Sequence, residues 1–253
     1  MKIAVITGAS SGLGEQFALA VDKHRPEIEE IWLIARRKER LCEVARKLSK
    51  KSKILALDIV NDLDVKLLEK ELMDAENEVA LLINNAGYGK QGKFDTFTAA
   101  DSAGMVRLNC EALTVITALC LPFMKEGGEI INSCSIASFV PNTSMAVYSS
   151  TKAFVMSLSR ALRVELKNRK INVLAACPGP MSTEFLSVAG ITDGKSKAFD
   201  RLPRVNPTEM ALKSLKASKR KKAVYTNKFF YKLYRVIAKL LPKSLVMLVS
   251  GTE

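Results

Sequence analysis

Short apolar runs and helical patterns alternate along the whole chain, and this alternation limits the possible folds more than any other feature. The apolar runs are continuous, which is typical of strands that are covered on both faces. The candidate strands are residues 3–7, 31–35, 54–57, 80–84, 129–134, 171–176 and 223–227. The candidate helices between them are residues 12–24, 38–50, 62–75, 98–125 and 146–168.

This alternation predicts an α/β fold: about seven parallel strands in a doubly wound, Rossmann-like sheet with helices on both faces. No repeat and no Pro/Gly/Ser-rich linker interrupts the pattern, so we expect one domain over residues 1–253. Ligands of such sheets bind at the carboxyl ends of the strands, near the point where the strand order reverses. The motifs described below all lie at or just beyond the end of a candidate strand.

The composition is that of an ordinary soluble chain, with 48% apolar and 26% charged residues. Its five cysteines are scattered and lack the spacing of metal ligands, so we expect reduced thiols, a cytoplasmic location and no metal site. The first apolar run is too short for a signal peptide. No stretch reaches the roughly 18 apolar residues of a membrane span, so we expect neither secretion nor membrane insertion.

The first candidate strand leads into the glycine-rich segment TGASSGLG, residues 7–14, and then into a helix. Gly8, Gly12 and Gly14 would let the backbone approach a pyrophosphate, whose charge the N–H groups and dipole of the helix terminus attract. The segment therefore predicts a dinucleotide site. The alternative is a tight strand-to-helix turn that binds nothing.

The end of the second candidate strand indicates which dinucleotide is bound. An acidic residue there would hold the ribose 2′-hydroxyl of NAD, but this chain has Ala35 followed by Arg36 and Arg37. Arginine suits a 2′-phosphate through charge-assisted hydrogen bonds. We therefore expect NADP(H) rather than NAD, with Arg36 the better placed of the two arginines. The alternative is a solvated, basic helix start.

The pattern YSSTK places Tyr148 and Lys152 four residues apart, on one face of a predicted helix. Reducing a ketone needs a hydride at carbon and a proton at oxygen, and a free tyrosine with a pKa of about 10 releases its proton reluctantly. A nearby ammonium group should lower the pKa of Tyr148. In isolation the pair could be two solubilising residues, but Ser135 before it and PGPMST after it favour catalysis.

Seven motifs in a fixed order resemble the short-chain dehydrogenase/reductase family, over roughly residues 1–190. They are TGASSGLG (7–14), LDI (57–59), NNAG (84–87), RLN (107–109), NSCSIAS (132–138), YSSTK (148–152) and PGPMST (178–183). The resemblance implies an oxidoreductase whose residues 1–183 bind the cofactor and carry out catalysis. The spacing that is usual in the family selects Ser135 among three neighbouring serines.

The resemblance also implies the roles of single residues. Tyr148 would exchange the proton and Lys152 would bond the nicotinamide ribose. Ser135 would stabilise the developing alkoxide, and Asn109 would hold a water that relays protons to Lys152. Asn84 would steady the central strand. The cofactor would contact Gly8, Ser10, Ser11, Gly12, Leu13, Gly14, Arg36, Arg37, Asp58, Ile59, Asn85, Ala86, Gly87, Tyr148, Lys152, Pro178, Gly179, Met181 and Thr183.

Residues 184–206 correspond to the substrate lid of the family, with Gly190 and Gly194 as candidate hinges. The apolar residues of the lid and those that precede Tyr148 suggest a pocket for a lipophilic carbonyl compound, such as a steroid, an acyl ketone or a lipid-like ketone. These residues are Phe139, Val140, Met145, Phe185, Leu186 and Val188.

The C-terminal part is a distinct basic segment. Residues 210–252 contain eleven Lys or Arg and no acid, so this segment carries most of the chain's net charge of +13. In the extension 228–253, basic and apolar residues fall on different faces of a predicted amphipathic helix. The basic face holds Lys228, Lys232, Arg235, Lys239 and Lys243, and the apolar face holds Phe229, Phe230, Leu233, Ile237, Leu240 and Leu241.

Three partners fit this amphipathic helix. It could cover the substrate pocket or a subunit contact with its lysines in water, or lie on an anionic membrane surface. It could also receive an acidic carrier protein. We expect no nucleic acid, because no module that reads a groove or stacks bases accompanies the basic segment.

The leading hypothesis is an NADP(H)-dependent oxidoreductase that interconverts a ketone and an alcohol. The alternative is a non-catalytic, NADP-binding regulator of the same fold, although the chain keeps its serine, tyrosine and lysine. By the resemblance, residues 98–125 and 146–168 would form the contacts of a homo-oligomer, either a dimer or a tetramer.

Overall fold

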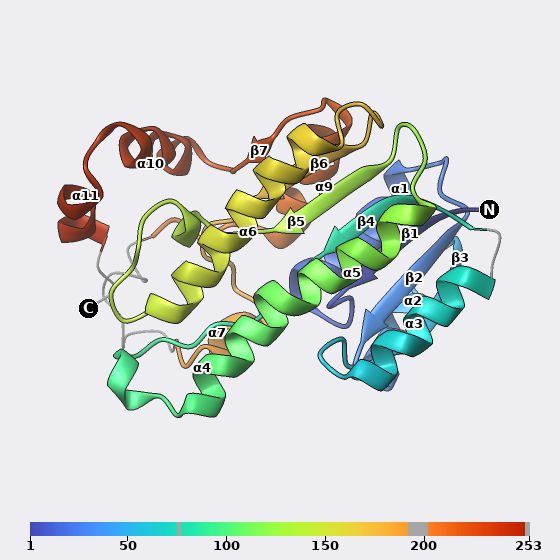
Figure 1. Ribbon diagram of the computed structural model, residues 1–253, viewed down its shortest axis with the longest axis horizontal. Helices are drawn as coiled ribbons and strands as arrows, with labels where there is room; N and C mark the ends of the chain where they lie inside the picture. Colours follow the sequence, from blue (N-terminus) through green and yellow to red (C-terminus); the bar gives the residue numbers. More distant parts are fainter. Residues whose placement is uncertain (75–76, 192–201, 251–253) are drawn as a thin grey trace.

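Seven parallel strands form one sheet in the computed structural model, which describes residues 1–74, 77–191 and 202–250 (Figure 1). The strand order is β3-β2-β1-β4-β5-β6-β7, so the order reverses between β1 and β4. The strands are β1 (Lys2–Thr7), β2 (Glu30–Ala35), β3 (Lys51–Ala56), β4 (Glu78–Asn84), β5 (Glu129–Ser133), β6 (Asn172–Ala176) and β7 (Val224–Tyr225). The predicted fold class is therefore confirmed.

Helices cover both faces of the sheet, as the strand–helix alternation predicts. The helices on one face are α1 (Gly12–His24), α2 (Lys38–Ala45) and α9 (Pro207–Lys219). Those on the other are α3 (Asp62–Asp74), α5 (Leu113–Cys120) and α6 (Ala146–Glu165). In Figure 1 the long helix that contains α5 runs beside α6 in front of the sheet.

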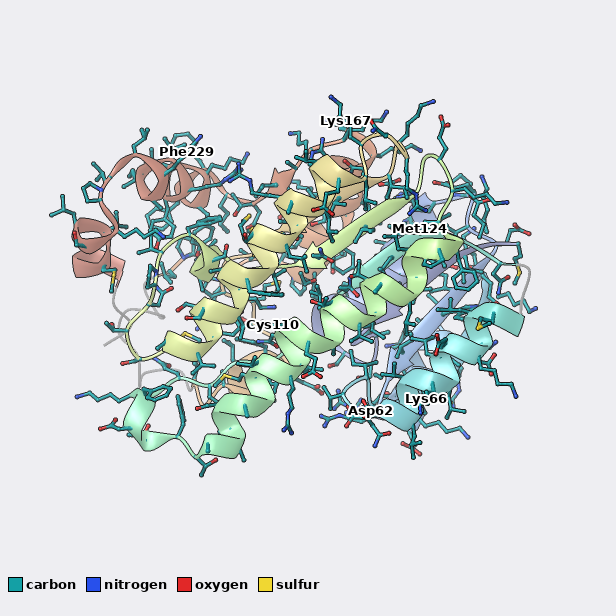
Figure 2. The ribbon with its side chains drawn as sticks, viewed as in Figure 1. Asp62, Lys66, Cys110, Met124, Lys167 and Phe229 are labelled. Carbon is teal, nitrogen blue, oxygen red and sulfur yellow. The ribbon has the colours of Figure 1, made fainter. Side chains whose placement is uncertain are left out.

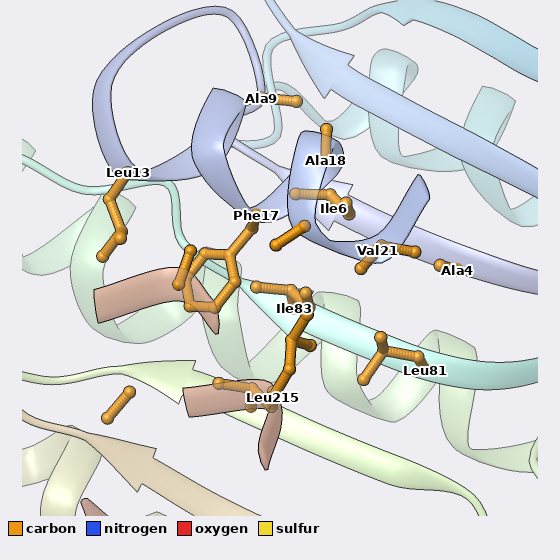
Figure 3. Packing of buried hydrophobic residues seen from close by; sticks show 14 of the residues in the cluster. Ala4, Ile6, Ala9, Leu13, Phe17, Ala18, Val21, Leu81, Ile83 and Leu215 are labelled. Atoms are coloured by element: carbon orange, nitrogen blue, oxygen red, sulfur yellow. The ribbon is translucent and has the colours of Figure 1, made fainter. Parts of the chain in front are cut away.

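Successive side chains of each strand enter different cores. Ala4 and Ile6 of β1 pack with Phe17 and Leu215 on the α1 and α9 side, as Figure 3 shows. Ile3 and Val5 face the side of α3 and α5. Both faces of the sheet are buried, so the side chains that point to either face are apolar. This explains why the apolar runs are continuous and do not alternate with polar residues.

The long helix predicted over 98–125 forms, but it is not uniform. It consists of α4 (Ala99–Val106), a π-helical segment (Arg107–Ala112), α5 and a 3₁₀ turn (Leu121–Phe123). By length and composition residues 99–123 could cross a membrane, yet Ile116 and Cys120 pack in the core against the sheet. A π-helical turn shifts the side chains that follow it and is frequent at functional sites. Here it contains Asn109.

Helix α9 was not predicted, although its sequence carries the signals of a helix start. Pro207 is the first helical residue, and the side chain of Asn206 accepts a hydrogen bond from the N–H of Glu209 at 3.1 Å. Helix α2 is also shorter than predicted. Asp22 accepts hydrogen bonds from the N–H groups of Ser49 and Lys50, which direct the chain into β3.

The C-terminal extension forms two helices rather than one: α10 (Phe229–Leu240) and α11 (Lys243–Ser250). Leu241 has an extended backbone, as expected before Pro242, and this ends α10. Both helices lie at one end of the molecule (Figure 1). Tyr231 ties α10 to the body, because its side chain is fully buried and its hydroxyl donates to the carbonyl of Pro203 at 2.8 Å.

Candidate active site

A cleft of about 1230 Å³ lies at the carboxyl ends of the central strands, where the strand order reverses. The glycine-rich segment, the segments after β2, β3, β4 and β5, the start of α6 and helix α10 all contribute to its wall. Of the residues predicted to contact a cofactor, all except Gly14 line this cleft. The sequence motifs, which are far apart along the chain, therefore meet at one place.

The three glycines of the first turn have different functions. Gly8 and Gly12 have φ of 65° and 57°, the left-handed region that favours glycine. A Cβ on Gly8 would lie 2.8 Å from the Cα of Ala86, and one on Gly14 would lie 2.0 Å from the carbonyl oxygen of Gly8. Gly14 is thus required for packing, whereas Gly8 and Gly12 shape the wall of the cleft.

Helix α1 begins at Gly12, within this turn, and the preceding N-cap residue Ser11 makes no side-chain capping bond. The N–H groups of the first helical turn have no partner within the helix and, together with the helix dipole, favour an anion. The local structure therefore suits a pyrophosphate.

The two arginines after β2 are held differently. Arg37 pairs with Glu184 at 2.7 Å and also donates to the hydroxyls of Ser10 and Ser11, at 3.2 and 3.0 Å. This pairing lowers the pKa of Glu184. Arg36 is largely exposed, and its guanidinium lies 4.0 Å from the carboxylate of Asp58. Arg36 is therefore the freer of the two to bind an incoming anion.

Hydrogen bonds fix the end of β4 beside the glycine turn. The hydroxyl of Thr7 accepts from the N–H groups of Asn85 and Ala86 at 3.0 and 3.1 Å. The side chain of Asn84 donates to Asn132 on the neighbouring strand and to Thr117, at 2.9 Å each. Through these two hydrogen bonds Asn84 can steady the central strand, which is the role expected from the sequence.

Tyr148 lies in the wall of the cleft and is 92% buried, since 8% of its surface is exposed. Its ring contacts Phe185, with 5.5 Å between the ring centroids, and a Cβ on Gly89 would lie 2.7 Å from the tyrosine Cδ2. The Lys152 Nζ is 5.8 Å from the centre of the Tyr148 ring and donates to the carbonyl of Ser133 at 2.8 Å.

Burial dominates the ionisation of this pair. It raises the pKa of Tyr148 well above the ordinary value near 10, while a hydrogen bond with Ser135 acts in the opposite direction. Burial likewise lowers the pKa of Lys152. The shift of Tyr148 is opposite to the one expected from the sequence, because the cost of burying a phenolate exceeds the effect of the neighbouring groups.

Ser135 follows β5 and caps the short 3₁₀ helix Ile136–Ser138, where its hydroxyl accepts from the N–H of Ala137 at 3.1 Å. This turn aims the side chain into the cleft beside Tyr148. The preceding Cys134 is buried, and its thiol donates to the carbonyl of Lys152 at 3.2 Å. Cys134 thereby supports the helix that carries the tyrosine and the lysine.

Asn109 does not line the cleft. Its amide oxygen accepts from the N–H of Tyr88 at 3.0 Å, and its amide nitrogen donates to the carbonyl of Tyr88 and the hydroxyl of Thr151. A Cβ on Gly87 would meet both Asn109 and the Nζ of Lys152. The side chain of Asn109 therefore lies behind the cleft and holds the backbone near Lys152.

The segment predicted to be a lid begins with α7 (Glu184–Val188), and Phe185, Leu186 and Val188 line the cleft as expected. Met145 also lines it, whereas Phe139 packs its ring on Tyr234 and Val140 is buried elsewhere. The candidate hinge Gly190 has φ of 71°. Gly194, and the part of the predicted lid over 192–201, lie outside the described residues.

Sequence reasoning did not predict which cleft residues the extension would supply. Those residues are Phe230, Tyr231, Leu233, Tyr234, Ile237 and Val246. A Cβ on Gly179 would lie 2.3 Å from the Tyr231 ring, so the Pro-Gly motif and α10 are in direct contact. One face of α10 therefore lines the cleft, as expected from the alternative in which the extension covers the pocket.

Comparison with known proteins shows the family and agrees with the fold. A family model described as short chain dehydrogenase matches residues 2–192. An uncharacterised oxidoreductase of Staphylococcus epidermidis is 28% identical over 225 residues, which cover 84% of this chain and 96% of that protein.

Similarity to solved structures extends over most of the chain. A short-chain dehydrogenase from Sphingobium yanoikuyae in complex with NADPH has a TM-score of 0.77 and 27% identity, covering 96% of this chain and 97% of that chain. The bulky-bulky ketone specific alcohol dehydrogenase from Comamonas testosteroni has a TM-score of 0.75 and 26% identity, covering 94% of this chain and 91% of that chain.

Proposed function

The chain belongs to the short-chain dehydrogenase family and is an oxidoreductase of that type, and from this premise we propose that it interconverts a ketone and a secondary alcohol with NADP(H). One observation carries the proposal: the buried phenol of Tyr148 lines the same cleft as the glycine turn that suits a pyrophosphate. A proton donor and a dinucleotide site at one place are what carbonyl reduction requires.

The donors of the cleft fit a dinucleotide. The pyrophosphate would lie on the turn of Gly8 and Gly12 at the start of α1, and Asp58 would contact the adenine. The nicotinamide would lie against Pro178, Gly179 and Thr183, with Met181 between them. When bound, the cofactor supplies the hydride.

The preference for NADP(H) over NAD rests on the end of β2. Ala35 offers no carboxylate to a ribose hydroxyl, and Arg36 and Arg37 follow it at the wall of the cleft. Two guanidinium groups suit a 2′-phosphate. The similar protein from Sphingobium yanoikuyae is described in complex with NADPH, which agrees with this preference.

Tyr148 is proposed to protonate the carbonyl oxygen during reduction. Its raised pKa keeps the phenol protonated near neutral pH, which is the form that a proton donor needs. Ser135 would donate a hydrogen bond to the same oxygen as its charge develops. Lys152 would hold the ribose and return a proton to Tyr148, while Asn109 would keep the backbone around Lys152 in place.

The substrate is proposed to be a bulky, lipophilic ketone. Met145, Phe185, Leu186 and Val188 present apolar side chains to the cleft, and α10 adds Leu233 among others. The similar alcohol dehydrogenase from Comamonas testosteroni is described as specific for bulky-bulky ketones. A steroid, an acyl ketone and a lipid-like ketone all have the required shape and polarity.

The direct test is a panel of carbonyl compounds assayed with NADPH and with NADH. We expect turnover of bulky apolar ketones and a kcat/KM at least about tenfold higher with NADPH, since a charged hydrogen bond contributes roughly 1.5–3 kcal/mol. Replacing both arginines (Arg36→Ala/Arg37→Ala) should remove this preference and leave the rate with NADH unchanged. Turnover of small hydrophilic sugars alone would contradict the proposed substrate class.

A further inference from the structure

Helices α10 and α11 and the turn between them carry a group of apolar side chains that are each at least 37% exposed. Single exposed apolar residues are ordinary, but a contiguous group on two consecutive helices usually marks an interaction surface. Figure 2 labels one of its members, Phe229, at the start of α10. This C-terminal patch consists of Phe229, Phe230, Leu233, Val236, Ile237, Leu240, Leu241 and Leu245.

At 3.6 residues per turn, the side chains of α10 fall into three stripes. The stripe with Tyr231 and Tyr234 contacts the body, through Gly179 and Phe139. A second stripe, with Phe229, Val236 and Leu240, belongs to the C-terminal patch and faces away from the cleft. The third stripe is basic and entirely exposed, and it comprises Lys228, Lys232, Arg235 and Lys239.

The charge on this surface has a single sign. Residues 210–252 contain no acid, and no ion pair within the described part of the chain includes Arg235, Lys239 or Lys243. We propose that α10 and α11 dock the protein on an anionic membrane surface, with the C-terminal patch in the acyl–headgroup boundary and the basic stripe on lipid phosphates. Apolar burial and electrostatic attraction then act together.

A bilayer fits this surface better than a second copy of the chain. A two-fold contact through the patch would bring the two basic stripes close together, and like charges across an interface are unfavourable. In a membrane, by contrast, long basic side chains beside an apolar face extend to the headgroups while their methylene groups remain in contact with apolar surface.

Docking would also orient the cleft. Phe230, Leu233 and Ile237 belong to the C-terminal patch and line the cleft as well. The side of the cleft formed by α10 would then face the bilayer, and an apolar ketone could enter from the lipid. This consequence rests on the proposed function, whereas docking itself does not.

The test is cosedimentation of the full chain with vesicles of phosphatidylglycerol and with vesicles of phosphatidylcholine. We expect binding to phosphatidylglycerol that weakens as salt is added, and at least tenfold weaker binding to phosphatidylcholine. Replacing two outward residues that do not line the cleft (Val236→Ser/Leu240→Ser) should reduce binding at least tenfold. Ketone reduction in detergent-free buffer should be unchanged, which separates docking from catalysis.

A matched control is available on α3. Leu63 and Leu67 are 70% and 52% exposed and lie four residues apart. Leu240 and Val236 are 73% and 52% exposed and have the same spacing. Leu63→Ser/Leu67→Ser should therefore bind vesicles like the wild type. For charge, Arg235→Glu/Lys239→Glu should abolish binding while Lys66→Glu/Lys70→Glu should not. Lys66 lies far from Phe229 in Figure 2.

Three outcomes would overturn the docking proposal. The first is no cosedimentation with phosphatidylglycerol. The second is wild-type binding by Val236→Ser/Leu240→Ser, which would show that the C-terminal patch does not enter the acyl–headgroup boundary. The third is self-association without lipid that this variant abolishes, which would assign the patch to a second copy. Point variants are preferable to deleting 228–253, because deletion also removes the buried Tyr231.

Discussion

Burial governs the ionisable side chains at the centre of this site. Tyr148 has little exposed surface, and the phenolate would lose most of its hydration. The hydroxyl of Ser135 compensates only in part, so the pKa of Tyr148 remains raised. For the proposed reduction of a ketone this shift is favourable, because a proton donor must be protonated.

The sign of this shift gives a pH dependence for the two directions of the reaction. Reduction uses the phenol, so its kcat/KM should not fall between about pH 6 and 9, below the raised pKa of Tyr148. Alcohol oxidation uses the phenolate, so its kcat/KM should rise about tenfold per pH unit over the same range. Initial rates in both directions in buffers of constant ionic strength measure this.

Ser135→Ala provides the internal control for the pH profile. Loss of its hydrogen bond removes a cause that lowers the pKa of Tyr148, so the oxidation profile should move to higher pH. An oxidation rate that is independent of pH in the wild type would show that Tyr148 is not the group that loses the proton.

Among the elements, the loop after β2 and the lid helix α7 are joined by one ion pair. Arg37 and Glu184 meet at 2.7 Å across the mouth of the cleft, beside the hydroxyls of Ser10 and Ser11. A 2′-phosphate bound by Arg37 would compete with the carboxylate of Glu184. The segment that we propose to bind the 2′-phosphate is therefore in contact with the first helix of the proposed lid.

Glu184→Gln should accordingly lower the Kd for NADPH by up to about fivefold, because an exposed ion pair contributes roughly 0.2–1 kcal/mol. The Kd for NADH should not change. Fluorescence titration of each cofactor measures both values. Glu43→Gln is a matched control, since Glu43 pairs with Arg40 at 3.0 Å and similar exposure, outside the cleft. An equal change for both cofactors would contradict competition at the 2′-phosphate.

For the molecule as a whole, local signals in the sequence were sufficient to predict the architecture. The apolar runs indicated all seven strands, and the glycine turn and YSSTK lie at the cleft as predicted. Long-range contacts were not predictable. Nothing near Tyr231 in the sequence indicates that its ring packs on Gly179, and nothing near Glu184 indicates Arg37 as its partner. Burial, which raises the pKa of Tyr148, also appears only once the chain is folded.

The oligomeric state is a further prediction for the whole molecule. Helix α6 exposes a stripe of small and apolar residues, with Phe154 44% and Val164 73% exposed, and the family resemblance implies a contact there. Sedimentation velocity should give at least twice the 27.8 kDa of one chain. Phe154→Glu should produce monomers, whereas Phe94→Glu, at an exposed 3₁₀ turn (Phe94–Thr96), should not. A monomeric wild type would contradict the prediction.

The most direct test of the mechanism is the rate of NADPH-dependent ketone reduction by Tyr148→Phe, measured beside NADPH binding. This variant keeps the buried ring and its contact with Phe185 and loses only the hydroxyl. We predict a fall in kcat of about 10²- to 10⁴-fold, which is the range for a lost general acid, with NADPH binding unchanged. Tyr225→Phe on β7, outside the cleft, should retain full activity. Reduction by Tyr148→Phe at the wild-type rate would contradict the assignment of this phenol as the proton donor.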